Sequence, residues 1–188
     1  MRSAMNKGEF RKLIKEQDAA LSESEKLATD KKIFQNLLLL DILKCKTVFT
    51  YISFGKEVET KDIIKLLLES GKRVCVPICR GNGLMEAKQI SSEDELIRGM
   101  YGIYEPPESS LTVKPSELEL IIAPGLAFGE DCTRLGRGAG YYDRFIEKAE
   151  NAKVIALCRE KNVFKTVPCD THDRAVDVIV TEKRIIKK

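Results

Sequence analysis

The chain has 188 residues, of which 43% are hydrophobic and 32% are charged, a composition typical of one globular domain with a filled core. Its 32 basic residues nearly balance its 29 acidic residues, so the net charge of +3 gives no indication of nucleic-acid binding. No apolar run approaches the roughly 18 residues of a membrane span, and the start MRSAMNKGEF has no apolar signal-peptide core. We expect a cytoplasmic protein without nucleic-acid or membrane partners, and we take it to be a monomer. Met5 is a second candidate start, which would make residues 1–4 an extension.

The cysteines and the single histidine do not follow a metal-binding pattern. Only Cys75 and Cys79 of the six cysteines are close in sequence, and their spacing is neither CxxC nor a paired zinc spacing. We therefore expect mostly buried, reduced thiols rather than a zinc site or a disulfide framework.

The N-terminal forty residues predict two helices. Residues 6–18 place Phe10, Leu13 and Ile14 on one helical face. Ser22 followed by Glu25 forms a capping box, which predicts a second helix running to about Leu40.

The next stretch predicts a parallel strand–helix–strand unit. Thr47–Ile52 is rich in β-branched and aromatic residues, as strands are. A short loop, SFGKEVE, then leads to Thr60, which we predict as the N-cap of a helix over Lys61–Glu69. Gly71 ends that helix, and Arg73–Ile78 predicts the second strand. The whole stretch, about thirty residues, has the length of a right-handed parallel βαβ unit.

Strands and helices continue to alternate to the end of the chain. The pattern predicts strands at Leu84–Ile90, Leu120–Ala123, Lys153–Leu157 and Val176–Val180, and helices at Ser92–Ile97 and Tyr141–Ala149. The prolines of Gly102–Pro115 predict an extended surface connection. This alternation predicts an α/β fold, with residues 1–188 forming a single three-layer domain in which helices flank a mostly parallel, twisted sheet.

About sixteen residues with little helix or strand character separate strand Leu120–Ala123 from the helix that begins at Tyr141, so we predict a long loop there. Loops of this length are uncommon in compact domains and are usually functional or disordered. Leu126, Phe128 and Leu135 are apolar anchors within it and favour an ordered loop.

Three alternating glycines, Gly136, Gly138 and Gly140, lie just before that helix. Glycines let backbone N–H groups approach an anion closely, and the helix N-terminus adds a partial positive charge. Arg134 and Arg137 are spaced to reach phosphate oxygens from the same loop. The spacing is neither that of a P-loop nor that of a dinucleotide-binding fold. The same residues would also be compatible with a flexible turn whose arginines are solvated.

The loop PGLAFGEDCTRLGRGAGYYDRF resembles the signature of the 5-formyltetrahydrofolate cyclo-ligase family, also called methenyltetrahydrofolate synthetases. Three further segments agree with that family in order and spacing. They are an N-terminal helix with Lys7 and Arg11, the strand-to-helix loop YISFGKEVET, and the late segment VPCDTHDRAVDVIVTE. The resemblance extends from about Lys7 to Glu182, and four ordered motifs are far more specific than the glycine loop alone.

The resemblance implies which residues form the site. The ATP-binding residues would be Lys7, Arg11, Arg134, Leu135, Gly136, Arg137, Gly138, Ala139, Gly140, Tyr141 and Tyr142. The folate-binding residues would be Ile52, Glu57, Arg137, Gly138, Ala139, Gly140 and Tyr141. Asp143 and Asp173 would bind Mg²⁺, and Arg137 and Tyr142 would be catalytic.

Residue chemistry agrees with these roles but leaves alternatives open. Glu57 follows a strand end, where ligands bind in open α/β sheets, and it could accept two N–H bonds from a pterin; it could also be a solvated residue before a helix. Asp143 could bind Mg²⁺ beside phosphates or only favour the helix dipole. Asp173 could instead brace its own turn, with His172 orienting that loop. Lys7 and Arg11 share a helical face that suits phosphates and solvent equally.

The chain departs from the family pattern at two places. Some relatives have a lysine between the last two loop glycines, where this chain has Ala139. Many relatives have alanine and an aromatic residue after strand Lys153–Leu157, where this chain has Cys158 and Arg159, so Arg159 could face phosphate or solvent. We also expect Phe54 to touch the folate only weakly.

The implied reaction is an ATP- and Mg²⁺-dependent cyclisation of 5-formyltetrahydrofolate to 5,10-methenyltetrahydrofolate, with ADP and phosphate released. The formyl oxygen would accept the γ-phosphoryl group, giving an N5-iminium phosphate, and N10 would close the ring. One alternative is a nucleotide- and folate-binding module of the same fold without turnover, which Ala139 and the Cys158–Arg159 pair would favour. Another is a sugar-phosphate enzyme that uses the same anion loop without ATP.

Overall fold

The computed structural model describes residues 5–99 and 102–188, so the suggested extension, residues 1–4, lies outside the described residues. The helices are α1 (Lys7–Ala19), α2 (Glu23–Leu38), α3 (Lys61–Glu69) and α4 (Tyr141–Lys148). The strands are β1 (Thr47–Thr50), β2 (Arg73–Cys79), β3 (Met85–Ile90), β4 (Ile97–Arg98), β5 (Tyr104–Glu105), β6 (Thr112–Val113), β7 (Leu120–Ala123), β8 (Ala127–Gly129), β9 (Arg134–Leu135), β10 (Lys153–Leu157), β11 (Val163–Phe164), β12 (Val178–Val180) and β13 (Ile185–Lys187).

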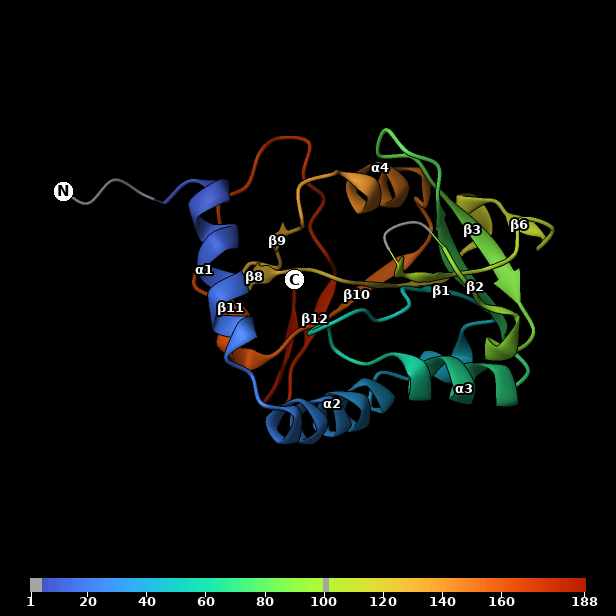
Figure 1. The fold of residues 1–188 in the computed structure, drawn as a ribbon, viewed down its shortest axis with the longest axis horizontal. Helices are drawn as coiled ribbons and strands as arrows, with labels where there is room; N and C mark the ends of the chain where they lie inside the picture. Colours follow the sequence, from blue (N-terminus) through green and yellow to red (C-terminus); the bar gives the residue numbers. More distant parts are fainter. Residues whose placement is uncertain (1–4, 100–101) are drawn as a thin grey trace.

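An eight-stranded sheet, in the order β13-β12-β10-β7-β1-β2-β3-β6, forms the middle layer. Its five central strands, β12, β10, β7, β1 and β2, are parallel to one another. The outer strands β13, β3 and β6 pair antiparallel. Helices α2 and α3 lie on one side of the sheet and α4 on the other (Figure 1). The predicted α/β fold with a mostly parallel sheet flanked by helices is confirmed, as is the βαβ unit of β1, α3 and β2.

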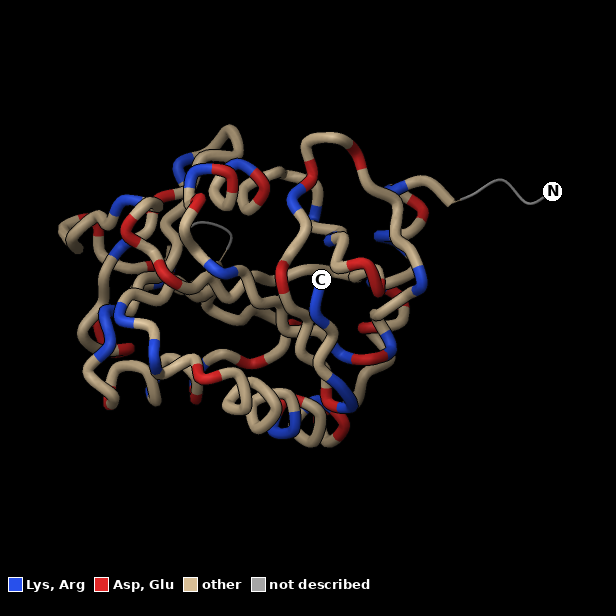
Figure 2. Tube along the Cα trace, turned by 180° about the vertical axis from the view of Figure 1, so that it is seen from behind, with Lys and Arg blue, Asp and Glu red and all other residues tan. Residues whose placement is uncertain are grey.

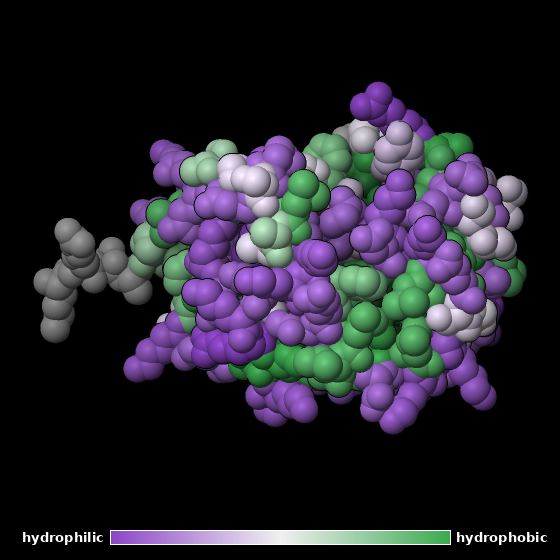
Figure 3. Space-filling model, turned by 90° about the horizontal axis from the view of Figure 1, so that it is seen from below, coloured by the Kyte–Doolittle hydropathy of each residue, from purple (hydrophilic) through white to green (hydrophobic). Residues whose placement is uncertain are grey.

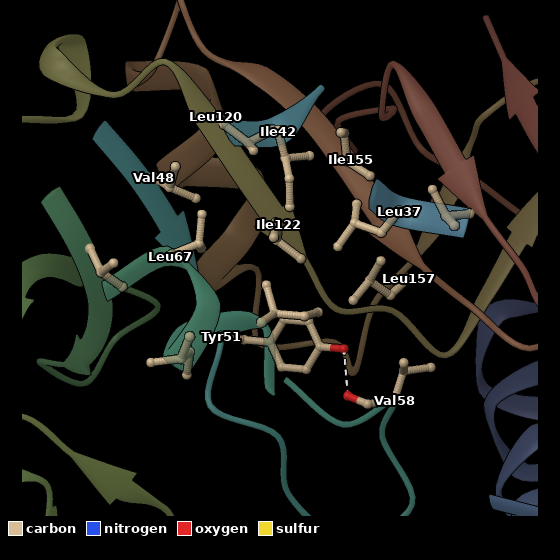
Figure 4. Packing of buried hydrophobic residues seen from close by; sticks show 14 of the residues in the cluster. Leu37, Ile42, Val48, Tyr51, Val58, Leu67, Leu120, Ile122, Ile155 and Leu157 are labelled. Atoms are coloured by element: carbon tan, nitrogen blue, oxygen red, sulfur yellow. Dashed lines mark hydrogen bonds between the residues drawn. The ribbon is translucent and has the colours of Figure 1, made fainter. Parts of the chain in front are cut away.

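Each face of the sheet has its own apolar core, because buried parallel strands present apolar side chains in both directions. On the α2–α3 face, Leu37 and Leu67 pack against Val48, Ile122 and Leu157 (Figure 4). The Tyr51 hydroxyl lies at the edge of this core and donates to the Val58 carbonyl at 2.8 Å. This bond ties the end of β1 to the start of the α3 segment.

On the opposite face, α4 is anchored by Phe145. Its ring lies 4.5 Å from the ring of Phe49 in β1, and both side chains are buried. Cys75, Ile121 and Ala156 of the neighbouring strands complete the contact. The position of α4, and hence of the loop before it, therefore depends on this packing.

The long loop before α4 contains strands that the sequence did not predict. β8 and β9 pair antiparallel, and β11 joins β8 as a third strand. Helix α1 covers this small sheet, since Phe10 and Ile14 pack against Leu126, Ala127 and Leu135. The prediction of little strand character was wrong, because these short strands depend on burial under α1 rather than on local propensity.

One of two predicted helix starts is confirmed, and the other differs from the prediction in its hydrogen bonds. The Ser22 capping box is confirmed, with Glu25 closing it from N3. Thr60 occupies the N-cap of α3, but its hydroxyl donates to the Tyr51 carbonyl at 2.8 Å and does not cap the helix. It therefore braces the end of β1, which stops at Thr50 rather than Ile52.

Other predicted elements are shorter than expected. The helix over Ser92–Ile97 is a 3₁₀ turn, Glu93–Glu95, and Ile97 belongs to β4. The connection Gly102–Pro115 contains β5 and β6, and β13 was not predicted. These strands have two or three residues each, too few for a period-2 pattern to appear in the sequence.

Basic and acidic residues are both distributed along the chain trace in all parts of the fold (Figure 2). Seen from below, hydrophilic side chains cover most of the face, with an apolar area among them (Figure 3). Within residues 5–99 and 102–188, no helix has the length and apolarity needed to cross a bilayer.

The packing of α4 leads to a stability prediction. Phe145→Ala should lower the free energy of unfolding by about 3–5 kcal/mol, because it leaves a cavity against Phe49, and Phe145→Leu should lower it less. Urea denaturation measures both. Leu27→Ala, at a 68% exposed helical position, is the control and should change stability by less than about 0.5 kcal/mol. A loss below about 1 kcal/mol for Phe145→Ala would contradict the anchoring role.

Candidate functional site

A cavity of about 340 Å³ opens beside the carboxyl ends of β1 and β7. This is the edge at which open α/β sheets bind ligands. Its lining combines apolar side chains with residues 134–140, called here the glycine-rich segment, and with the start of α4. The lining residues are Tyr51, Ile52, Phe54, Glu57, Pro77, Cys79, Met85, Ile103, Tyr104, Glu105, Pro124, Gly125, Arg134, Gly136, Arg137, Gly138, Ala139, Gly140, Tyr141, Tyr142 and Asp143.

The glycine-rich segment has a shape that other residues would strain. Gly138 and Gly140 have φ values of +108° and +70°, a region that L side chains rarely adopt. A Cβ at Gly138 would also lie 3.3 Å from the Arg11 guanidinium carbon. The Arg11 Nε donates to the Gly136 carbonyl at 2.9 Å, so α1 is fastened to this segment.

Arg134 is buried beneath the loop rather than solvated. Its Nη2 donates to the Asp143 carboxylate at 2.6 Å, and its Nη1 donates to the Pro124 carbonyl at 3.3 Å. Its guanidinium lies 5.8 Å from the centre of the Tyr142 ring, within the range of a cation–π contact. The alternative of a flexible turn with solvated arginines is therefore excluded for Arg134.

Arg137 and Glu57 form an ion pair at 2.7 Å that joins the glycine-rich segment to the β1–α3 loop. Glu57 is only 17% exposed, whereas Arg137 is 56% exposed. Glu57 also accepts the Phe54 backbone N–H at 2.9 Å. Glu57 is thus a held carboxylate at the cavity wall, not a solvated residue before a helix.

The two predicted metal ligands lie on neighbouring segments, but each has a cationic partner. Asp143 bonds Arg134 and also accepts the Arg174 backbone N–H at 3.0 Å, which brings α4 against the loop that carries Asp173. Asp173 accepts hydrogen bonds from the Lys7 ammonium and from the Asp170 backbone N–H. Burial works to raise the pKa of the Asp173 carboxyl, but these two hydrogen bonds, together with the nearby charges of Lys7 and His172, outweigh it and lower the pKa.

Lys7 therefore contacts an acidic loop rather than solvent. Its ammonium also lies 2.6 Å from Asp170. Burial lowers the pKa of Lys7, but the bonds to Asp170 and Asp173 more than compensate and raise it. Asp170, His172 and Asp173 each offer one potential ligand atom within 4.8 Å of one another, a group that does not include Asp143.

Asp143 and Asp173, the two carboxylates that the sequence predicted as ligands, are of the donor type that a hard cation takes. Mg²⁺ takes one or two protein carboxylates and completes its shell with phosphate oxygens and water. Asp143 and Asp173 are partly exposed and lie on touching segments, so they fit that requirement. Their present cations, Arg134 and Lys7, neutralise the same charges that a metal would neutralise.

Tyr142 lines the cavity, and its phenol is in the neutral form. The hydroxyl oxygen is buried and has no hydrogen-bond partner among the described residues. Burial, followed by the negative charge of Glu57, raises the pKa of the phenol well above its usual range. A neutral, unpaired phenol can donate a hydrogen bond to a ligand.

Arg159, outside the predicted site set, has a different environment from the one the sequence suggested. Its side chain is 4% exposed and pairs with Asp30 of α2. It also donates to the Thr29 hydroxyl at 3.0 Å and to the Lys56 carbonyl at 2.8 Å. The expectation that Arg159 faces phosphate or solvent was wrong, because α2 supplies a buried carboxylate that no local pattern indicates.

The thiols are only partly as expected. Cys75, Cys132 and Cys158 are buried and Cys45 and Cys79 are half-buried, but Cys169 is exposed. Cys79 lines the cavity, and burial raises the pKa of its thiol.

Sequence reasoning missed one wall of the cavity. Pro77, Met85, Ile103 and Tyr104 come from β2, the antiparallel strand β3 and the β4–β5 hairpin. No glycine, charge or spacing pattern distinguishes these residues, so only the fold identifies them.

Known proteins resemble this chain over most of its length. A sequence model of the 5-formyltetrahydrofolate cyclo-ligase family matches residues 3–182. The 5-formyltetrahydrofolate cyclo-ligase of Mycolicibacterium smegmatis is 34% identical over 145 residues, covering 74% of this chain and 75% of that protein. The protein of the same name from Mus musculus is 28% identical over 182 residues, 90% of each chain. The NMR structure of the Aquifex aeolicus 5,10-methenyltetrahydrofolate synthetase has a TM-score of 0.87 at 31% identity, over 97% of this chain and 93% of that one.

The Arg159 network leads to a second stability prediction. Arg159→Met should lower the free energy of unfolding by about 3–5 kcal/mol, because it removes one of the two cations beside the buried Asp30 carboxylate. The double variant with Asp30→Leu should recover part of that loss. Lys44→Met removes an ion pair that is exposed on both sides and should cost less than about 1 kcal/mol. Urea denaturation compares the variants, and equal losses for Arg159 and Lys44 would contradict the role of the network.

Proposed function

The chain belongs to the 5-formyltetrahydrofolate cyclo-ligase family, a family of ligases, and we propose that it converts 5-formyltetrahydrofolate to 5,10-methenyltetrahydrofolate with ATP and Mg²⁺. The observation that carries this proposal is the Glu57–Arg137 pair at the wall of the apolar cavity. One partner suits a pterin and the other a phosphate, so the pair marks where two substrates would meet. We further propose, from composition alone, that the enzyme acts as a cytoplasmic monomer on these small molecules.

The apolar cavity is the proposed folate site. Ile52 and Tyr104 offer flat or branched apolar surface to aromatic rings, and Glu57 offers a carboxylate. A pterin edge has adjacent N–H groups, which a carboxylate binds through two charge-assisted hydrogen bonds. Gly138 and Tyr141 border the same space and would contact the folate from the loop side.

The glycine-rich segment is the proposed phosphate site. Its backbone, from Arg134 to Tyr142, leads into the N-terminus of α4, which favours anions. Lys7 and Arg11 approach from α1, as the contacts of Arg11 with Gly136 and of Lys7 with Asp173 illustrate. When Glu57 binds a pterin, Arg137 is released to neutralise phosphate oxygens.

The proposed chemistry needs positioning and charge neutralisation rather than a protein nucleophile. The formyl oxygen attacks the γ-phosphorus of ATP, ADP leaves, and an N5-iminium phosphate forms. N10 then adds to the iminium carbon, loses its proton, and phosphate departs to give the methenyl ring. Arg137 stabilises the transferring phosphoryl group, and the neutral Tyr142 phenol donates a hydrogen bond to an oxygen of the same group. Asp143 and Asp173 would hold Mg²⁺, which supplies further charge neutralisation for the phosphates.

The first test is the reaction itself. Purified protein given 5-formyltetrahydrofolate, ATP and Mg²⁺ should produce the methenyl absorbance together with stoichiometric ADP, and neither should appear when either substrate is omitted. Binding of both substrates without product would instead support a binding module. A sugar-phosphate enzyme would show no rise in melting temperature with Mg²⁺–ATP, whereas the proposed function requires such a rise.

The proposed contact of Glu57 with the folate can be tested separately from the binding of ATP. Glu57→Gln should raise the KM for 5-formyltetrahydrofolate by about tenfold or more, since a charge-assisted hydrogen bond is lost, while the KM for ATP changes little. The matched control is Glu59→Gln in the same loop. Glu59 is not among the described residues that line this cavity or the second cavity, of about 300 Å³, which Glu57 and Arg137 also line. Unchanged folate kinetics in the Glu57 variant would refute its placement at the pterin.

A further inference from the structure

Arg144 of α4 joins two segments that are distant in the sequence. Its Nη1 donates to the Ala139 carbonyl at 3.0 Å and to the Gly83 carbonyl at 3.3 Å. Ala139 belongs to the glycine-rich segment, whereas Gly83 belongs to the turn between β2 and β3, which lies beside α4 (Figure 1). The guanidinium therefore fastens the glycine-rich segment to this turn.

Gly83 leaves the space that this guanidinium occupies. A Cβ at Gly83 would overlap Arg144 Nη1 and would lie 2.8 Å from the Ala139 carbonyl oxygen. At Gly81, in the same turn, no described atom lies within 4 Å of the corresponding position. The φ angle is +73° at Gly83 and +77° at Gly81, so the backbone shape favours glycine at both positions. Only at Gly83 does the close approach of Arg144 give a second reason for glycine.

The turn is itself restrained by contacts at its base. The Arg80 backbone N–H donates to the Leu84 carbonyl at 2.9 Å and closes the turn. The Arg80 guanidinium pairs with Glu86 at 2.8 Å and with Glu108 at 2.6 Å. The carbonyl that Arg144 bonds in this turn is therefore part of a hydrogen-bonded hairpin.

Arg144 and Arg11 together orient two peptide groups of the glycine-rich segment. Arg11 bonds the Gly136 carbonyl, and Arg144 bonds the Ala139 carbonyl. A trans peptide group is planar, so its C=O and its N–H point in opposite directions. The two arginines therefore direct the N–H groups that follow these carbonyls to the side away from their own guanidinium groups.

The two N–H groups that are oriented in this way belong to Arg137 and Gly140. Among the described residues, neither N–H donates to a backbone acceptor. Arg137 is exposed and Gly140 is half-buried, so neither peptide group is enclosed in the core. Backbone N–H groups with fixed directions beside a helix N-terminus are the kind of donor that binds phosphate oxygens.

We propose that Arg144 is a positioning residue for the ATP phosphates, because it holds the Ala139 carbonyl against the β2–β3 turn and so sets the direction of the Gly140 N–H. The inference deepens the proposed function and rests on it for the identity of the anion. A glycine-rich backbone without this contact would sample more conformations, and ordering it during binding would reduce the affinity for the nucleotide. Arg144 thus acts through the backbone, not through its own charge.

The test measures the binding of ATP and of 5-formyltetrahydrofolate to the full chain by calorimetry in Mg²⁺. Arg144→Met should weaken ATP binding by about fivefold or more, the effect of one lost hydrogen bond, and should leave the folate affinity within about twofold of the wild-type value. A merely structural role would lower the melting temperature without changing ATP affinity alone. Lys148→Met removes a charge from the last turn of the same helix and is the matched control, with both affinities unchanged.

Gly83→Ala tests the same contact without removing a charge. Its Cβ would displace the Arg144 guanidinium, so ATP binding should weaken about as much as in Arg144→Met. Gly81→Ala introduces the same backbone strain in the same turn and should leave the ATP affinity within about twofold of the wild-type value. The double variant Arg144→Met with Gly83→Ala should lose less affinity than the product of the two single effects, because both changes disturb one contact.

Salt dependence distinguishes positioning from direct attraction between Arg144 and the phosphates. Salt screens the attraction between exposed charges, but it does not alter the direction of a peptide N–H. The ratio of wild-type to Arg144→Met affinities for ATP should therefore change by less than about twofold between about 0.05 M and 0.5 M salt. A ratio that falls to one at high salt would mean that Arg144 acts by charge, and would overturn the positioning role.

Unchanged ATP affinity in Arg144→Met, or equal losses in Gly83→Ala and Gly81→Ala, would also overturn the inference. If thermal melting shows that Arg144→Met does not fold, the comparison of the two glycine variants decides in its place. Normal ATP-dependent turnover in the wild-type protein, with unchanged ATP affinity in Arg144→Met, overturns the role of Arg144 alone. Absence of both product and ATP binding in the wild-type protein overturns the proposed function and the inference together.

Discussion

The ion pair between Glu57 and Arg137 is the interaction on which the arrangement of the candidate site depends. It joins the β1–α3 loop to the glycine-rich segment, and both cavities lie against it. The two loops come from distant parts of the chain and meet because β1 and β7 are adjacent and parallel. A ligand that competes for either partner would change the walls of both cavities.

A second constraint is that each candidate ligand-binding charge already has a partner. Arg134 holds Asp143, and Lys7 holds Asp173 and Asp170. Unpaired charges in partly buried positions would be costly, so the pairs keep the site folded without ligands. Phosphates would be negatively charged and Mg²⁺ positively charged. On binding, phosphates would replace the carboxylates as partners of the basic side chains, and Mg²⁺ would replace the basic side chains as the partner of the carboxylates. Helix α1 takes part in both arrangements, since it carries Lys7 and also covers the β8–β9 hairpin.

Several parts of the site could be read from the sequence, and others could not. The glycine-rich segment, Arg11 and Glu57 belong to contiguous motifs, and the structure brings them to one edge of the sheet. The wall formed by Met85, Ile103 and Tyr104 has no motif. The sequence allowed Arg159 to face phosphate or solvent, but Arg159 pairs with Asp30, which lies in α2 far earlier in the chain.

The sequence by itself determined the order of the main strands and helices, the parallel βαβ unit and the family, because periodicity, capping residues and ordered motifs are local properties. Only the tertiary structure decided which charges are paired, where the short strands β8, β9 and β13 form, and that two cavities meet at Glu57 and Arg137. The physical reason is that burial and pairing depend on groups brought together by the sheet. Arg159 illustrates this best, since its buried partner Asp30 lies 129 residues away in the chain.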